Sequence, residues 1–491
     1  MFIIYAICFS IPQYAQIRSD FILANEGSSN QFHIKYDDQG RLYATWGSDG
    51  VYFGVYDSLG NPFFPTQIVK TTNYTTGNPR LALNKTNIPI VWNEVVQSFN
   101  RFVFGRTLTN NGVPISEEFV VNDPFYDSVR NWTDVTFLND STFIVVWSGE
   151  GLSSPFTSNN SVWGQRLTTS LKYIGENIQI SEHVMNSPAH GNSRVLKLNE
   201  SGDFVVIWQD KHSGSRKVYG RLFYSDGTPQ DSSFLISEDS QITDVWSISA
   251  VTNDGNNFAV VWSAEIDTLW QIYWRRFKTN STPLSSAKKI NTSPGVGTKY
   301  PCVDIAIGDR GNYIIVWEQK YNGYLKIFGQ KFYSDSVALG VNFRISTFPD
   351  SFSHGFPNVT ILNNKILTAW RANRAIWANV IKYSNSPVGI EHDYYTDITQ
   401  PIKLFQNYPN PFNASTIIKF NVSEASIVKL DIYNLLGEMI VNLQNELALP
   451  GEYQVLWDGK DSKRQVVPSG IYFYRLKTSG FSQIRKLLFV Q

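Results

Sequence analysis

The residues best suited to acid–base chemistry in this sequence are five acidic side chains, each of which follows a recurring tryptophan. They are Glu94, Glu150, Asp210, Glu265 and Glu318. Two carboxylates about 5–10 Å apart are what the hydrolysis of a glycosidic bond requires. An acidic residue at such a position also keeps an ordinary solvated hairpin polar. We favour the hairpin interpretation, because the sequence brings no two of these carboxylates together.

A second group of candidates consists of aromatic and histidine side chains near the ends of predicted strands. Aromatic rings there could stack on sugar rings, and a histidine could assist. The candidate ligand-binding residues are Trp132, Trp246, Tyr300 and His354. Together with His183 and His190, His354 could instead bind a metal. Histidines on separate loops seldom converge, so we predict no metal and no other cofactor.

Other kinds of chemistry leave no motif in the sequence. It contains no GxSxG elbow, HExxH, phosphate-binding loop or CxxC pair. The Asp/Asn-rich turns lack the bidentate glutamate of a calcium loop. The 42 basic and 42 acidic residues cancel, which gives no electrostatic footprint for nucleic acid. We therefore predict no catalytic residue and no nucleic-acid partner.

The elements that must position these candidates are set by a repeat. The segment Phe204-Val205-Val206-Ile207-Trp208 recurs with variations, ending in tryptophans at positions 46, 92, 147, 208, 262, 317 and 370. A regular interval of this kind is typical of repeat folds. A strand that is apolar at every position, without alternation, indicates cover on both faces. We expect each tryptophan to pack between neighbouring sheets.

One complete unit, residues 193–237, predicts a four-stranded antiparallel meander. Its register should place Trp208 opposite Tyr219, Arg221 near Val206 and Asp210 near Lys217. Seven such units over residues 17–381 predict a seven-bladed β-propeller. The seventh unit lacks a fourth strand, and residues 20–25 read as a strand with no unit of their own. We predict that this N-terminal strand pairs with the seventh unit and closes the ring.

The connections of the repeat fall into two kinds. Turns between strands one and two, and between three and four, are short and rich in Asp, Asn and Gly. In a meander they lie on one side, here called the turn face. The other side, the loop face, carries long and dissimilar loops such as 291–300 and 346–355. Dissimilar loops on a rigid scaffold are where binding is usually found.

The two ends of the chain differ from the repeat. Residues 2–11 form an apolar run too short to span a bilayer, which predicts a signal peptide over residues 1–15. No other segment is apolar enough to be transmembrane. Residues 382–401 read as a polar linker. Residues 402–491 predict six short strands, at 416–422, 427–433, 438–443, 453–457, 471–477 and 483–490, and hence a small β-sandwich.

The C-terminal segment also contains a series of ordered motifs. It opens with Asn407-Tyr408-Pro409-Asn410-Pro411-Phe412-Asn413, continues through Tyr433-Asn434-Leu435-Leu436-Gly437 and Trp457-Asp458-Gly459, and ends with Pro468-Ser469-Gly470-Ile471-Tyr472 and Lys486-Leu487-Leu488-Phe489. In this order they resemble the type A C-terminal sorting domain of the type IX secretion system. The motif residues are Tyr408, Pro409, Pro411, Phe412, Thr416, Gly437, Gly470, Tyr472 and Lys486.

The resemblance implies an Ig-like fold for residues 402–491 and export through the periplasm to the cell surface or the medium. It also implies the type IX machinery as a partner, with a sortase as a possible second one. For the repeat region, we expect a binding or adhesion module for glycan or protein. The alternative is a secreted hydrolase, glycosidase-like, with its site on the loop face.

Overall fold

The computed structural model describes residues 16–490 except 25–30, 73–75, 97–99, 123–128, 151–159, 183–191, 212–213, 254–256, 294, 309, 348–351, 383–402, 414, 423–425, 449–450, 464 and 479–480. The predicted signal peptide, His183, His190 and residues 383–401 of the predicted linker thus lie outside the described residues. The chain divides into two compact units, Met1–Gly389 and Ile390–Gln491. Both are built from strands, and the described residues contain no helix, which confirms the all-β prediction.

The described part of the first unit contains seven four-stranded antiparallel sheets, six of which follow chain order. The strands of the first three are β2 (Phe32–Tyr36), β3 (Leu42–Gly47), β4 (Gly50–Tyr56), β5 (Gln67–Thr71), β6 (Thr76–Leu81), β7 (Asn87–Val96), β8 (Asn100–Thr109), β9 (Phe119–Val120), β10 (Val129–Asn139), β11 (Thr142–Glu150), β12 (Asn160–Thr168) and β13 (Tyr173–Gln179).

The next three sheets repeat this order. Their strands are β14 (Ser193–Lys197), β15 (Phe204–Asp210), β16 (Lys217–Phe223), β17 (Phe234–Leu235), β18 (Asp244–Asn253), β19 (Asn257–Ile266), β20 (Leu269–Lys278), β21 (Lys288–Lys289), β22 (Val303–Ile307), β23 (Tyr313–Tyr321), β24 (Tyr324–Phe332) and β25 (Ala338–Arg344). The seventh sheet joins the two ends of the unit, in the order β1-β28-β27-β26. Its strands are β1 (Gln16–Ala24), β26 (Gly355–Leu362), β27 (Lys365–Ala372) and β28 (Ala375–Lys382).

The register of the central unit confirms the predicted pairing. Trp208 of β15 lies opposite Tyr219 of β16, and Val206 lies opposite Arg221. All seven residues of β15 are buried, as expected for a strand covered on both faces. Trp208 shares its buried cluster with residues of the preceding sheet, including Ile144 and Val146 of β11. The recurring tryptophans therefore join one sheet to the next.

The seven recurring tryptophans act mainly through packing. Each is at most 1% exposed. Two of the indole N–H groups reach an acceptor, Trp92 at Glu94 and Trp317 at Gln319. No partner within the described residues is found for the indole N–H of five others, Trp46, Trp147, Trp208, Trp262 and Trp370. Burial of the large ring, rather than hydrogen bonding, is what these side chains contribute.

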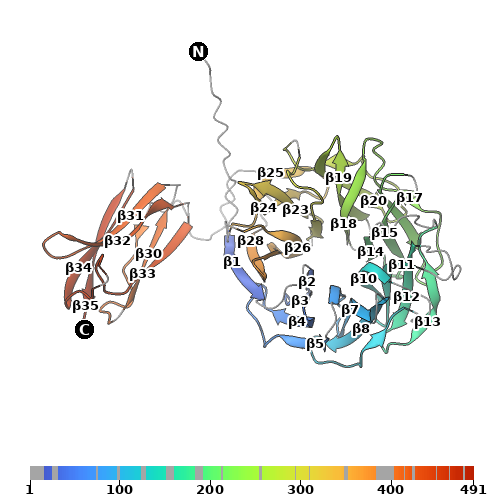
Figure 1. The fold of residues 1–491 in the computed structure, drawn as a ribbon, viewed down its shortest axis with the longest axis horizontal. Coiled ribbons are helices and arrows are strands. Elements are labelled where there is room, and N and C mark those ends of the chain that lie inside the picture. Colours follow the sequence, from blue (N-terminus) through green and yellow to red (C-terminus); the bar gives the residue numbers. More distant parts are fainter. Residues whose placement is uncertain are drawn as a thin grey trace, which may run out of the picture. The chain divides into compact units, whose positions relative to one another are not determined.

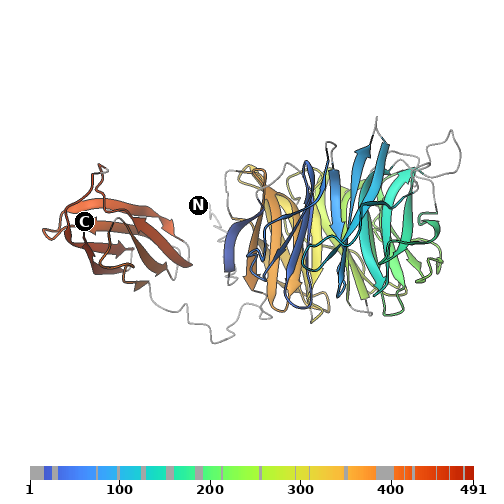
Figure 2. The same cartoon turned by 90° about the horizontal axis from the view of Figure 1, so that it is seen from below.

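The N-terminal strand completes the last sheet, as predicted. β1 pairs with β28 in antiparallel fashion, with Phe21 opposite Ala378. The first strands of successive sheets contact one another in chain order, and β26 of the seventh sheet contacts β2 of the first. The backbone N–H of Ile34 in β2 donates to Asn358 Oδ1 in β26 at 3.1 Å. Figure 1 shows the sheets of this unit side by side, with β2, β10, β14, β18 and β26 toward the middle, and Figure 2 shows the same unit from below.

The second unit consists of two antiparallel sheets with a common core. The three-stranded sheet has the order β29-β30-β33 and the four-stranded sheet the order β32-β31-β34-β35. The strands are β29 (Lys403–Leu404), β30 (Thr416–Val422), β31 (Ser426–Tyr433), β32 (Met439–Ala448), β33 (Gly451–Trp457), β34 (Gly470–Lys477) and β35 (Ser482–Phe489). Buried residues of both sheets, such as Phe420 and Leu430, belong to one cluster. Six of these strands were predicted, and β29 was missed because two residues carry no periodicity.

Candidate functional site

The first strands of several sheets are distorted at the same end. β6, β10 and β26 each carry an irregularity in register around Asn78, Trp132 and Phe356. These three residues have φ values of 50°, 66° and 55°. Tyr300, three residues before β22, has a φ of 58°. The left-handed region costs a non-glycine residue about 1–2 kcal/mol, and such strain is concentrated at functional sites.

These distorted strand ends line two adjoining cavities on the loop face. The larger, here called the loop-face pocket, has a volume of about 560 Å³ and is lined by residues that include Trp246, Tyr300, Glu318, His354 and Arg371. The smaller, here called the axial pocket, has a volume of about 50 Å³. Its lining includes Arg80, Trp132, Arg194, Asp304 and Asn358. Cys302 and Phe356 line both.

The structure thus brings the four candidate ligand-binding residues to neighbouring places. Trp246, Tyr300 and His354 line the loop-face pocket, and Trp132 lines the axial pocket. These residues are far apart in the sequence: 222 positions separate Trp132 from His354. Their role in binding stays a prediction.

Trp246 and Tyr300 form a preassembled aromatic platform. Their ring centroids are 4.7 Å apart, and Tyr300 also meets the edge of Trp270 at 5.1 Å. The Arg216 guanidinium lies 5.4 Å from the Trp246 ring and is held by two 2.6 Å hydrogen bonds to Asp244. Tyr300 remains 45% exposed. A rigid, partly exposed aromatic surface can bind an apolar face with little loss of conformational entropy.

His354 is placed differently from the aromatic candidates. Its side chain is buried and its ring stacks on Trp370 at 5.8 Å. Its Nε2 lies 3.4 Å from Lys326 Nζ. Within the described ranges no three His, Cys, Asp or Glu residues are grouped as metal ligands would be.

Three of the acidic residues that follow the tryptophans are buried, so their interpretation as solvated hairpin residues is wrong. Glu94, Asp210 and Glu318 are each at most 6% exposed. Glu94 accepts a hydrogen bond from Thr72 Oγ1, which lies outside its own hairpin. The sequence could not reveal this, because the covering residues come from other connections. Glu265 is half-buried, and the side chain of Glu150 lies outside the described residues.

Glu318 is the carboxylate of the loop-face pocket. Its two oxygens accept hydrogen bonds from the backbone N–H groups of Cys302, at 3.0 Å, and Phe356, at 2.7 Å. Burial raises the pKa of Glu318 to about 7, although these two hydrogen bonds oppose the shift. Burial also raises the pKa of the adjacent Cys302 thiol well above its usual value, so the thiol is protonated at neutral pH.

Charged residues in the axial pocket were not identified from the sequence. Arg80 and Arg194 lie inside first strands, and Asp304 lies in β22. Asp304 accepts hydrogen bonds from Ser249 Oγ at 2.6 Å and from the backbone N–H of Val359 at 2.8 Å. Burial raises the pKa of Asp304. The available signal was an arginine inside a predicted first strand, as in Ser193-Arg194-Val195.

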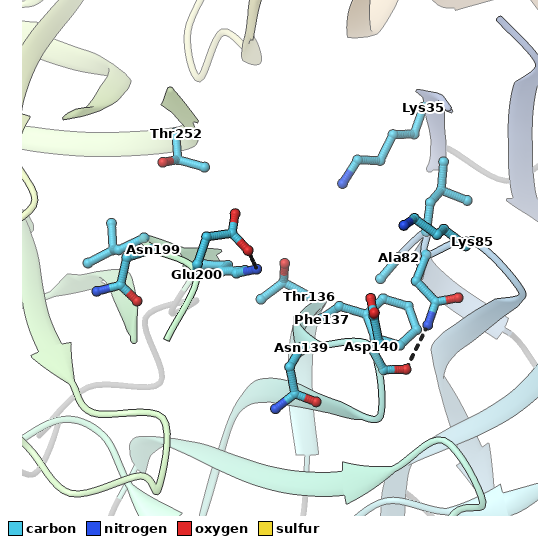
Figure 3. Close-up of a pocket in the computed structure, with 14 residues that line it drawn as sticks. Lys35, Ala82, Lys85, Thr136, Phe137, Asn139, Asp140, Asn199, Glu200 and Thr252 are labelled. Atoms are coloured by element: carbon cyan, nitrogen blue, oxygen red, sulfur yellow. Dashed lines mark hydrogen bonds and ion pairs between the residues drawn. The ribbon is translucent and has the colours of Figure 1, made fainter. Parts of the chain in front are cut away.

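The turn face has a cavity of its own, with a different character. Its volume is about 370 Å³, and turns between first and second strands supply most of its lining. Figure 3 shows Lys35 and Lys85 on one side of it, and Asn199 and Glu200 on the other. Lys197 forms an ion pair with Glu200 at 3.5 Å. This cavity lacks the clustered tryptophan and tyrosine rings of the loop-face pocket.

The motif residues of the second unit connect its two sheets. Phe412 is 2% exposed and packs against Trp457 and Phe489, with centroids at 5.5 and 4.9 Å. Thr416 Oγ1 donates to the Pro409 carbonyl at 2.8 Å. The remaining motif positions are at the surface or in turns and strands: Tyr408 is 80% exposed, Pro411 precedes Phe412, Gly437 turns between β31 and β32, Gly470 and Tyr472 lie in β34, and Lys486 lies in β35.

The sequence of this unit decides what it is. Residues 406–491 match the family described as "Secretion system C-terminal sorting domain". This segment is a type IX secretion C-terminal sorting domain. A sorting domain of this kind directs the protein through the periplasm to the cell surface or the outside of the cell. Among the described residues, no helix is both long and apolar enough to cross a membrane.

Comparisons of the whole chain give weaker similarities. The curated proteins contain no match. The chain is similar to PorZ, a surface component of the type IX secretion system of Porphyromonas gingivalis, with 12% identity and a TM-score of 0.39 over 95% of this chain. It spans 60% of PorZ. A Dyadobacter fermentans protein of unknown function (9% identity, TM-score 0.43, 76% of this chain and 100% of that one) is also similar.

A third similarity is to the α-L-arabinanase of Penicillium chrysogenum. It has 11% identity and a TM-score of 0.42 over 76% of this chain and 99% of that enzyme. None of the three similarities indicates what this chain binds, because both identity and TM-score are low.

Proposed function

We propose that the first unit is a seven-bladed β-propeller, spanning residues 17–381, whose loop face binds glycan or protein. Seven four-stranded sheets, the β1–β28 pairing and the contact of β26 with β2 support a closed ring. Together with an Ig-like sorting domain, 402–491, the chain is an exported binding module that the type IX machinery carries outward.

The observation that carries the binding proposal is the convergence of Trp246 and Tyr300 on the loop-face pocket. A volume of about 560 Å³ falls in the range of small-molecule sites. The platform is partly exposed, and the left-handed backbone at Tyr300 turns the chain at the pocket rim. These features favour a sugar ring, which offers an apolar face, over a flat protein surface.

Glycan-array binding of the full chain tests this proposal. We expect Tyr300→Ala and Trp246→Ala each to lower the affinity for any bound glycan about 2- to 10-fold, since an aromatic contact contributes about 0.5–1.5 kcal/mol. Tyr224→Ala is the matched control, because Tyr224 is 51% exposed but follows β16 on the turn face. Equal losses for Tyr224→Ala and Tyr300→Ala would contradict the proposed site.

A glycosidase-like hydrolase is the second candidate, and Glu318 is the observation that favours it. A carboxyl with a pKa near 7 suits a general acid at neutral pH. Against this role, both oxygens of Glu318 and both of Asp304 already accept hydrogen bonds from neighbouring strands. Hydrolysis of an array-identified glycan by the full chain, lost in Glu318→Gln, would establish the enzyme; unchanged glycan would exclude it.

The sorting assignment has a separate test in cells. We expect a chain without residues 402–491 to accumulate inside the outer membrane rather than at the surface or in the medium. The matched control is Lys85→Ala in the full chain, an exposed position of the first unit. Lys486→Ala asks separately whether this motif position matters for attachment by a sortase. Surface appearance of the truncated chain would overturn the export role of the domain.

A further inference from the structure

Two arginines in the axial pocket have unused hydrogen-bond donors. Arg194 is 9% exposed, and its Nη1 donates to Asn192 Oδ1 at 2.8 Å and to the Ser193 carbonyl at 2.9 Å. No acceptor in the described part of the chain is found for its Nε and Nη2. Arg80 is half-buried and, over the same residues, forms no side-chain hydrogen bond or ion pair. A buried charge without a partner is costly.

The nearby carboxylates do not compensate these arginines directly. Asp304 is satisfied by Ser249 and Val359, as described above. Asp134 accepts the backbone N–H of Val195 at 3.0 Å. No ion pair within 4.0 Å joins either aspartate to either arginine among the described residues. Both aspartates therefore accept hydrogen bonds from backbone N–H groups, while the two arginines line the axial pocket.

The two arginines also lie close enough to affect each other. Burial lowers the pKa of Arg194 to about 10, and the charge of Arg80 adds to this effect, whereas the charges of Asp134 and Asp304 oppose it. Arg194 remains cationic at neutral pH. An anion between them would relieve their repulsion and accept their free N–H groups in the fork geometry that suits carboxylates and sulfates.

We propose that the axial pocket binds an anionic substituent, a carboxylate or a sulfate, of a glycan whose ring lies on the Trp246–Tyr300 platform. This inference rests on the proposed function and narrows its ligand to acidic glycans. The axial pocket is about 50 Å³ in volume, which fits one small group rather than a sugar ring. Cys302 and Phe356 line both pockets, so the smaller pocket adjoins the one that would hold the ring.

The rim of the larger pocket has the same sign of charge. Arg371 and Arg374 line it; burial lowers the pKa of Arg371, and the charge of Arg374 adds to this effect. The carboxylate in this lining is Glu318, whose pKa of about 7 leaves it partly protonated at neutral pH. An acidic glycan would therefore meet attractive charge both at the rim and at the bottom of the site.

Binding of three oligosaccharide probes to the full chain tests the inference. The probes are oligogalacturonate, which carries carboxylates, sulfated dextran oligosaccharide and neutral dextran oligosaccharide. We expect at least one acidic probe to bind more tightly than the neutral probe and to weaken with added salt. Arg80→Ala and Arg194→Ala should lower that affinity about 10- to 100-fold, as expected for hydrogen bonds to charged groups. Preference for one acidic probe identifies the anion.

Matched variants separate binding from folding. Arg194→Lys keeps the charge and should bind more weakly than the wild type but more tightly than Arg194→Ala. Arg310→Ala removes an exposed arginine from the turn between β22 and β23 and should leave every affinity unchanged. Circular dichroism and thermal unfolding identify any variant that fails to fold, in which case Arg80→Ala and Arg194→Lys decide the outcome.

The remaining outcomes overturn the inference in distinguishable ways. If the neutral probe binds as tightly as the acidic ones through Tyr300, the inference fails and the proposed function stands. If no glycan binds, the inference fails together with the glycan part of the proposed function, and only protein binding is left. If the arginine variants affect binding of poly-glutamate but of no oligosaccharide, the pocket is an anion site for protein and the glycan assignment is wrong.

Discussion

Trp208 and Tyr300 are both large aromatic residues of the first unit, but they serve it in opposite ways. Trp208 is 1% exposed, lies in a regular strand and recurs at every repeat. Tyr300 is 45% exposed, has a left-handed backbone and lies outside the recurring pattern. Trp208 packs one sheet against the next, whereas Tyr300 lines the loop-face pocket and has a strained backbone.

This difference suggests where function is located in a repeat protein. Residues that follow the period are fixed by the need to cover both faces of each sheet. Residues that do not have to cover a sheet face are found where the strands are distorted, as at Trp132 and Phe356. An irregularity in strand register, such as a β-bulge, bends the strand and points a side chain in a new direction, and such irregularities are frequent next to binding sites. In this unit the departures from the repeat, rather than the repeat itself, point to the pocket.

The largest expected effect tests the packing half of this comparison. Trp208→Ala leaves a cavity between two sheets and should lower the free energy of unfolding by about 3–5 kcal/mol. Trp246→Ala, at the platform, should cost only about 0.5–1.5 kcal/mol, since it loses a ring pair that is partly exposed. Urea unfolding of both variants measures this contrast. Equal losses would remove the distinction between scaffold and site.

The next effect concerns the pocket carboxyl and pH. The pKa of Glu318 is raised from 4.5 to about 7, so the folded protein holds a proton that the unfolded chain releases. The contribution of Glu318 to the free energy of unfolding therefore falls as pH rises from about 4.5 to 7, by about 2–4 kcal/mol in total.

Glu318→Gln isolates this contribution, because glutamine does not titrate. The difference in unfolding free energy, wild type minus variant, should decrease between pH 4.5 and 7 and stay constant above. Carboxyls with lowered pKa, such as Asp57, act in the opposite direction but cancel in the difference. Parallel pH profiles would show that Glu318 is not perturbed.

A smaller effect tests backbone strain at the site. At a φ of 58°, alanine is strained and glycine is not, so Tyr300→Gly should be about 1 kcal/mol more stable than Tyr300→Ala. At Trp208, in a regular strand, glycine should be less stable than alanine by about 0.5–1 kcal/mol. Chemical unfolding of the four variants measures both differences, and the same sign at both positions would contradict the assignment of strain.

The smallest effect is expected on the turn face. Lys85→Ala removes an exposed charge beside the cavity of the turn face and should change the free energy of unfolding by less than about 0.5 kcal/mol. Glycan affinity should also be unchanged, as measured on the probes that test the axial pocket. A loss of binding in this variant would place the glycan site on the turn face instead of the loop face.

Much of the scaffold could be predicted because it depends on local pattern. The pairing of Trp208 with Tyr219 and of β1 with β28 followed from strand spacing and from one unit that lacked a strand. For the loop-face and axial pockets, the sequence indicated four separate residues but not that the fold brings them together. Neither the left-handed backbone at Tyr300 nor the burial of Glu318 has a signal in the local sequence, because both arise from segments brought together by the fold.

The β1–β28 pairing has a consequence for the order of folding. Phe21 and Ala378 are neighbours in one sheet but are separated by most of the first unit in sequence. Six sheets can form from contiguous hairpins, whereas the seventh must wait until both its distant segments have met. Until then, β1 and β28 each lack their partner, and β28 exposes an unpaired edge to other chains. For an exported chain, this last step determines when the unit becomes resistant to aggregation and proteolysis.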